Sequence, residues 1–164
     1  MLWLVNSQIL DRGDKLMSVN PLLQAHGLPR FSRILPEHVE LAIDTVLDGS
    51  KEQLKAICEQ PDNNWESVIE RLDEMSEKLG LTWSPVRHLN SVMNTEALHQ
   101  AYNACLPKIS EYHTELGQNR ALYNAVVNVQ QHPDSVQYSQ AQNKVLENMI
   151  RDFRLSGIDL PADE

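Results

Sequence analysis

The sequence lacks the residue clusters on which several common enzyme chemistries depend. Its six histidines stand at least eleven positions apart, so no two imidazoles lie one helical turn apart, as an HExxH zinc site requires. Its six glycines stand at least fourteen positions apart, which excludes GxGxxG and phosphate-binding loops, because both need clustered glycines. There is also no GxSxG nucleophile motif. We therefore assign no catalytic, cofactor-binding or metal-binding residue from sequence chemistry.

Cysteine and basic charge are also scarce. Cys58 and Cys105 stand far apart without a CxxC pair, and we interpret them as buried thiols in a reducing compartment. The chain has 14 basic and 23 acidic residues. The basic residues are spread from Arg12 to Arg154 without a run, which argues against a nucleic-acid partner. The apolar stretch Met1–Val5 is too short for a membrane span and lacks the basic flank of a secretory signal. We expect a cytoplasmic protein with no membrane partner.

What the sequence does contain is apolar side chains at the three- and four-residue spacing of amphipathic helices. No stretch alternates with period two, so we predict an all-α domain of about five antiparallel helices joined by short loops. The first helix begins at Pro36, and Gly49 either weakens it or divides it in two. Pro85 is expected to end or kink the second helix, and Pro107 to bend the third before Gly117 ends it.

The last helix is expected from about Val136 to Ser156. Its predicted inward side chains are Tyr138, Ala141, Val145, Leu146, Met149 and Phe153. A turn and helix cap are expected at Pro61–Asn64, before the second helix.

The chain divides into three predicted segments. Residues 1–16 are expected to be a disordered leader or an upstream-start extension, and residues 17–35 an extended arm. Residues 36–164 are expected to form a helical domain that is truncated at its C-terminal end. The reason is that Gly157 stops one helix, and Leu160-Pro161 begins another immediately before the last residues.

Two groups of polar residues are candidate sites. Glu111 and Glu115 share a helix face, but His113 points away from that face, so we interpret all three as a solvated surface.

Arg87 and His88 follow the expected break at Pro85, which is a plausible place for a functional side chain. We favour a structural interpretation, in which His88 and Asn90 satisfy backbone groups that Pro85 leaves open.

Several segments together form a distinctive series along the chain. The main ones are Asn20–Leu23 with Phe31–Val39, Ser84–Val92 and Arg151–Pro161. Shorter ones fall between them, at Trp65-Glu66, Leu106-Pro107, Ser110–Tyr112 and Leu122-Tyr123. In this order and spacing, the segments resemble the opening part of the thimet-oligopeptidase-like zinc metallopeptidases, in the oligopeptidase A group. The resemblance covers residues 17–164 of this chain, but only the front of the family's sequence.

The resemblance implies a cytoplasmic peptidase that cleaves short peptides, including signal-peptide remnants, in a deep channel between two mostly helical halves. In that family one zinc is held by the histidines of HExxH and a downstream glutamate, and none of these residues matches a position here. The expectation is therefore an N-terminal channel-wall segment that binds no zinc and is inactive alone. Its expected partners are short peptides, through the full-length enzyme, and the missing C-terminal catalytic part.

Two alternatives stay open at this point. Within the family, the resemblance implies an oligopeptidase A-like endopeptidase first, and a dipeptidyl carboxypeptidase-like member is the alternative, because that specificity is set largely by parts not present. The alternative from a different functional class is a stand-alone acidic helical module that binds peptides or another protein without catalysis.

Overall fold

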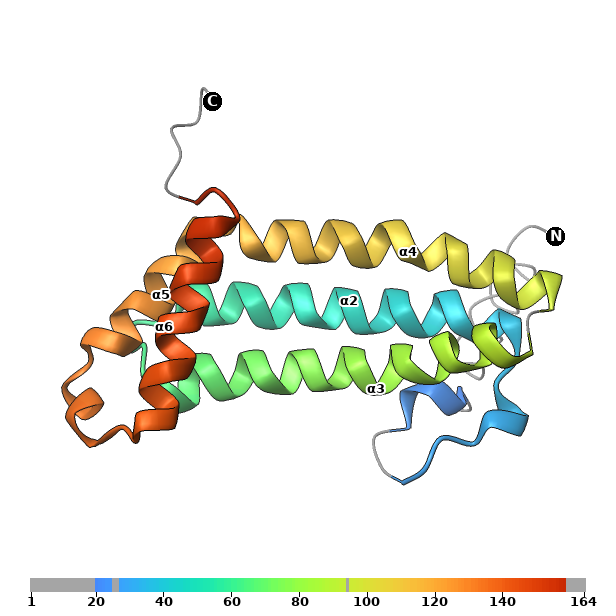
Figure 1. The fold of residues 1–164 in the computed structure, drawn as a ribbon, viewed down its shortest axis with the longest axis horizontal. Helices are drawn as coiled ribbons and strands as arrows, with labels where there is room; N and C mark the ends of the chain where they lie inside the picture. Colours follow the sequence, from blue (N-terminus) through green and yellow to red (C-terminus); the bar gives the residue numbers. More distant parts are fainter. Residues whose placement is uncertain (1–19, 25–26, 94, 159–164) are drawn as a thin grey trace, which may run out of the picture. The chain divides into compact units, whose positions relative to one another are not determined.

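The computed structural model describes residues 20–24, 27–93 and 95–158, and the predicted leader at 1–16 lies outside them. The described residues form five α-helices and no strand, which confirms the predicted all-α class. The helices are α2 (Pro36–Glu59), α3 (Arg71–Val92), α4 (Glu96–Gly117), α5 (Arg120–Gln131) and α6 (Gln140–Leu155) (Figure 1). None of the helices in this part of the chain is long and apolar enough to cross a membrane.

Four short helical turns accompany these helices. Two 3₁₀ turns, η1 (Pro21–Leu23) and η2 (Phe31–Arg33), lie in the segment expected to be an extended arm. A π-helical turn, η3 (Trp65–Glu70), leads directly into α3, and a 3₁₀ turn, η4 (Pro133–Gln137), follows α5. The predicted cap before the second helix is confirmed, because the Asn64 side chain accepts a hydrogen bond from the Ser67 amide at 2.9 Å.

The chain forms two compact units. Unit 1 comprises residues 1–48 and 77–108, and unit 2 comprises residues 49–76 and 109–164. The boundaries fall inside α2, α3 and α4, so each of these helices gives residues to both units.

In unit 1, the apolar faces of α2, α3 and α4 are buried, and polar side chains attach η1. The Asn20 side chain accepts from the Leu22 amide at 3.0 Å and donates to the His38 carbonyl at 2.9 Å. Trp83 of α3 stacks on Tyr102 of α4, with ring centroids 4.9 Å apart. The Asn20 hydrogen bond therefore attaches η1 to α2, and the stacked rings join α3 to α4.

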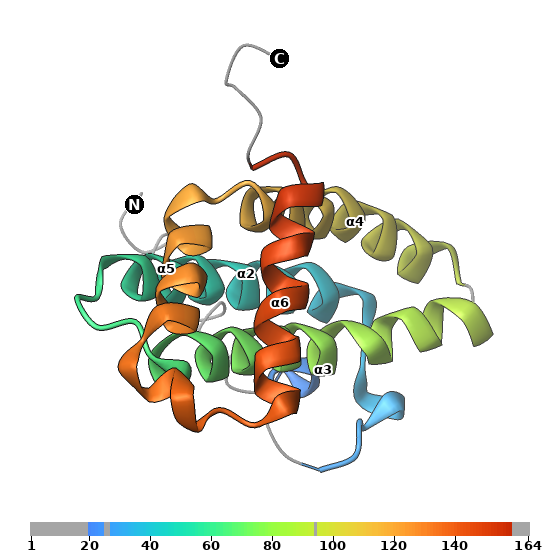
Figure 2. The same ribbon diagram turned by 60° about the vertical axis from the view of Figure 1, so that its left-hand side comes forward.

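In unit 2, α5 and α6 lie side by side and antiparallel (Figures 1 and 2). Their apolar faces join α2, η3 and α3 in one buried core. Its fully buried members include Ile57, Val68, Leu122, Val126, Val129 and Leu146. The core therefore joins segments from both ends of the unit's sequence.

Neither Gly49 nor Pro85 divides a helix. α2 is one continuous helix through Gly49. α3 continues past Pro85 to Val92, so of the predicted end or kink at Pro85 the end is wrong, and the kink stays a prediction. A proline inside a helix removes one backbone hydrogen bond, but Val86 and Leu89 are buried immediately after it. Their burial outweighs the lost bond and carries the helix onward.

The last helix starts later than predicted, and its predicted inward face is partly confirmed. It begins at Gln140, where Ser139 and Gln142 form a capping box. Residues 133–137 form η4 instead. Leu146 and Phe153 are buried as predicted, and Ile150, which was not predicted, is buried with them. Ala141 and Val145, also predicted to point inward, are exposed.

The predicted glycine stop of this helix is confirmed. Gly157 has a φ of +87°, in the left-handed region that favours glycine, and it follows directly after the end of α6. The Ile158 amide donates to the Phe153 carbonyl at 3.2 Å, which closes the helix end. The predicted restart at Leu160-Pro161 lies outside the described residues.

The orientation of α6 can be tested with two neighbouring apolar residues. Leu146→Ala should lower the free energy of unfolding by about 2–5 kcal/mol, because this fully buried side chain would leave a cavity. Val145→Ala should change it by no more than about 0.5 kcal/mol, because Val145 is 40% exposed. Urea denaturation followed by circular dichroism measures both. A larger loss for Val145→Ala than for Leu146→Ala would contradict this helix orientation.

Candidate functional site

The structure does not bring Glu111, His113 and Glu115 together around a common point. All three side chains are exposed on α4. Glu115 pairs with Lys51 of α2 at 3.3 Å, whereas the His113 ring packs against Tyr112 with centroids 5.6 Å apart. Among the described residues, no three His, Cys, Asp or Glu side chains are grouped so that they could hold a metal ion.

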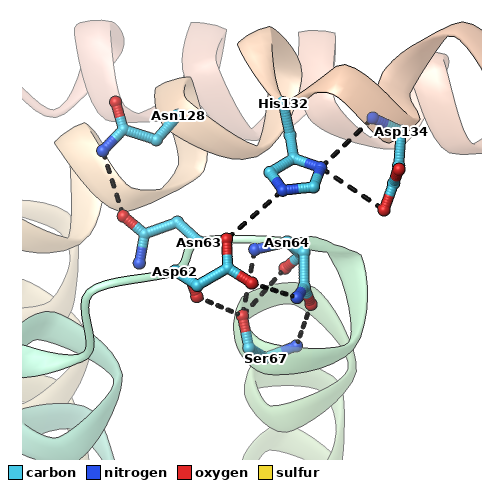
Figure 3. A network of polar contacts seen from close by, with 7 residues as sticks. All are labelled: Asp62, Asn63, Asn64, Ser67, Asn128, His132 and Asp134. Atoms are coloured by element: carbon cyan, nitrogen blue, oxygen red, sulfur yellow. Dashed lines mark hydrogen bonds and ion pairs between the residues drawn. The ribbon is translucent and has the colours of Figure 1, made fainter.

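A polar network that the sequence did not single out joins two connections in unit 2. Figure 3 shows its members, Asp62, Asn63, Asn64, Ser67, Asn128, His132 and Asp134. The Asp134 amide donates to His132 Nδ1 at 3.2 Å, and His132 Nε2 lies 3.3 Å from Asp62 Oδ1. A neutral ring protonated at Nε2 satisfies both contacts. The network therefore holds the loop before η3 against the end of α5.

The two thiols are poor nucleophiles. Cys105 is fully buried on α4, and burial raises its pKa to about 11. Cys58 is only half-buried, which corrects the prediction of two buried thiols. The pKa of Cys58 is raised as well, mainly by partial burial and to a smaller extent by the neighbouring Glu59 carboxylate. Nucleophilic cysteines need a lowered pKa, so neither residue fits that role.

The exposed face of α3 around His88 forms an open concave surface in unit 1. An open groove of about 490 Å³ is lined by Pro29, Phe31, Glu77, Gly80, Leu81, Ser84, Pro85 and His88. A smaller pocket of about 280 Å³ continues it and is lined by Ser84, Arg87, His88 and Ser91. The two share Ser84 and His88, and we call them together the α3 groove.

The residues of α3 in this groove form one helical stripe. Glu77, Leu81, Ser84, His88 and Ser91 follow at spacings of three and four, so they lie along a single face. η2 lies beside this part of α3 and supplies Phe31 (Figures 1 and 2). The Phe31 ring lies against the His88 ring, with centroids 5.2 Å apart.

The predicted structural role of His88 and Asn90 is wrong. Their side chains do not bond the backbone around Pro85: His88 packs on Phe31, and Asn90 Oδ1 lies 3.3 Å from His99 Nδ1 of α4. Pro85 has no amide hydrogen, so the Leu81 carbonyl lacks its normal helical donor beside the groove.

The groove carries opposite charges at its two ends. Glu77 lines the apolar end, and Arg87 lines the polar pocket together with His88. Among the residues that the structure describes, neither the Glu77 carboxylate nor the Arg87 guanidinium forms an ion pair. The groove therefore has an apolar floor between a carboxylate and a guanidinium, neither of which is paired within the described part of the chain.

Comparisons with known proteins support the resemblance seen in the sequence. The family model for the N-terminal domain of neurolysin and thimet oligopeptidase matches residues 43–164. The chain is 43% identical over 145 residues to oligopeptidase A of Haemophilus influenzae, covering 88% of this chain and 21% of the relative. It is 41% identical over 146 residues to oligopeptidase A of Escherichia coli, covering 88% and 22%. A probable cytosolic oligopeptidase A of Arabidopsis thaliana is 29% identical over 151 residues, covering 92% and 22%. The chain spans about a fifth of the length of these relatives.

The two thiols should differ in reactivity. At about pH 8 only about one thousandth of a thiol with the pKa of Cys105 is ionised, and the side chain is also inaccessible. We expect iodoacetamide to alkylate Cys58 at least about tenfold faster than Cys105 in the folded chain. Peptide mapping by mass spectrometry measures the two rates. Cys58→Ser should remove the fast phase and Cys105→Ser should keep it; equal rates would contradict the burial of Cys105.

Proposed function

The chain belongs to the neurolysin/thimet oligopeptidase family, and from this membership we propose that it is the N-terminal helical wall segment of an oligopeptidase that degrades short peptides. The observation that carries the proposal is the match over residues 43–164 together with identities above 40% to two bacterial oligopeptidases A. The all-α architecture agrees with it.

We propose that the chemistry of such an enzyme lies outside these 164 residues. The zinc that the family resemblance implies has no HExxH pair in this chain, because its histidines are at least eleven positions apart. The described residues also contain no grouping suited to a metal ion. We accordingly assign no zinc ligand and no catalytic residue here.

The role that remains for these helices is to shape access to the catalytic centre. Long helices with buried apolar faces make a rigid wall, and a narrow channel between such walls admits flexible peptides but excludes folded proteins. We propose a cytoplasmic location, on the basis of the family resemblance and of free thiols at Cys58 and Cys105.

A second candidate function is a stand-alone acidic binding module. The observation in its favour is the α3 groove, in which Phe31 is 40% exposed and Leu81 is 56% exposed. Exposed apolar side chains that gather in a concave surface are typical of interaction sites. The net charge of -9 would favour cationic partners.

A chimeric enzyme tests the proposed function. We expect that oligopeptidase A of Escherichia coli, with its aligned 146 residues replaced by the matching residues of this chain, will cleave peptides within about tenfold of the parent rate. The reason is that a wall segment supplies shape and packing, both of which relatives at 41% identity preserve. Hydrolysis of an internally quenched fluorescent peptide measures the rate.

Two controls make that result interpretable. The Escherichia coli enzyme without the 146 residues should be inactive, and this chain alone, with added Zn²⁺, should not cleave the peptide. A chimera that is helical by circular dichroism and binds zinc, yet cleaves nothing, would contradict a wall role. Cleavage by this chain alone would contradict the placement of the chemistry elsewhere.

A further inference from the structure

The α3 groove has the charge pattern of a site for a small zwitterion. Its carboxylate, on Glu77, and its guanidinium, on Arg87, lie at opposite ends, and neither forms an ion pair with another described residue. Two partly exposed opposite charges that do not neutralise each other are complementary to a ligand with an ammonium group at one end and a carboxylate at the other.

The spacing of the two charged residues along α3 indicates the length of the ligand. Glu77 and Arg87 are ten residues apart on α3, which at the helical rise places their backbones about 15 Å apart along the axis and turns their side chains about 80° apart around it. An extended peptide advances by about 3.3–3.6 Å per residue, so a peptide of about four or five residues spans this axial distance. A dipeptide spans only about 7 Å, less than half of it.

The middle of the groove suits apolar side chains and a peptide backbone. Phe31, Leu81 and Pro29 supply an apolar floor between the charged ends. The Leu81 carbonyl, which Pro85 deprives of its helical donor, lies beside this floor and is able to accept a hydrogen bond from a peptide amide. Ser84 supplies a hydroxyl at the junction of the two pockets.

We propose that the α3 groove binds short peptides of four to five residues with free termini, the peptide ammonium at Glu77 and the peptide carboxylate at Arg87 and His88. The apolar side chains of the peptide lie on Phe31 and Leu81. This site deepens the proposed function, on which it rests for the choice of a peptide among zwitterions. It adds recognition of peptide ends at a position on this chain that carries no catalytic group.

The test is a titration of the whole 164-residue chain with a synthetic pentapeptide, Ala-Leu-Phe-Leu-Ala, followed by ¹H–¹⁵N NMR. We expect saturable shifts at groove residues, including Leu81 and His88. N-acetylation and C-amidation should each weaken binding by about threefold to fivefold, the effect of one exposed ion pair. The dipeptide Leu-Phe should bind more weakly than the pentapeptide.

Two charge-removing variants identify the ends. With Glu77→Gln, acetylation should no longer weaken binding, while amidation still does; with Arg87→Gln, the dependence should be reversed. Glu111→Gln and Arg71→Gln are the matched controls, because both residues are exposed and neither lines the groove. They should behave as the unchanged chain does.

Three results would overturn the proposal. The first is the absence of saturable shifts at groove residues, and the second is binding that ignores both blocking groups. The third is a concentration-dependent shift of groove residues without peptide, which would mean that a second copy of the chain covers the groove. None of these three results changes the outcome expected for the chimeric enzyme. Conversely, an inactive chimera with intact peptide binding would leave this site in place and favour the stand-alone binding module.

Discussion

Burial of one apolar stripe along each helix is the interaction on which both units depend. The two cysteines are free thiols, so no disulfide closes the chain. The ion pairs among the described residues are at the surface, as between Lys108 and Asp44, where such a pair contributes at most about 1 kcal/mol. Burying a single leucine or isoleucine contributes about 1.5–3 kcal/mol. The helices are therefore held by packing, and their polar faces are left available for other roles.

Where this burial follows a regular spacing, the sequence predicts the fold well. In α2 and α5 the buried apolar residues recur every three or four positions, which is the spacing on which the all-α prediction rests. The extent of α3 was not predicted, because the local effect of Pro85 competes with the burial of Val86 and Leu89 beyond it. In α6, Val145 and Leu146 are adjacent apolar residues. The capping box at Ser139 and Gln142 marks where the helix starts. The spacing of Leu146, Ile150 and Phe153, at i, i+4 and i+7, places Leu146 on the buried face.

The site was much less predictable than the fold. Phe31 and His88 are far apart in sequence, and periodicity along one helix contains no information about a 3₁₀ turn packed beside it. Glu77 and Arg87 are ordinary surface charges when considered singly. They become a site only once helical geometry places them along one groove with an apolar floor between them.

The two proposals assign different kinds of selection to the same helices. A channel wall selects by width, since it excludes anything thicker than an extended chain. Two opposite charges on residues about 15 Å apart along α3 select by length, because a peptide of similar span satisfies both best. Neither kind of selection needs a catalytic group, and both need a rigid spacing. A continuous α3 supplies that spacing, because the helix persists through Pro85 and holds Glu77 and Arg87 on one rigid element.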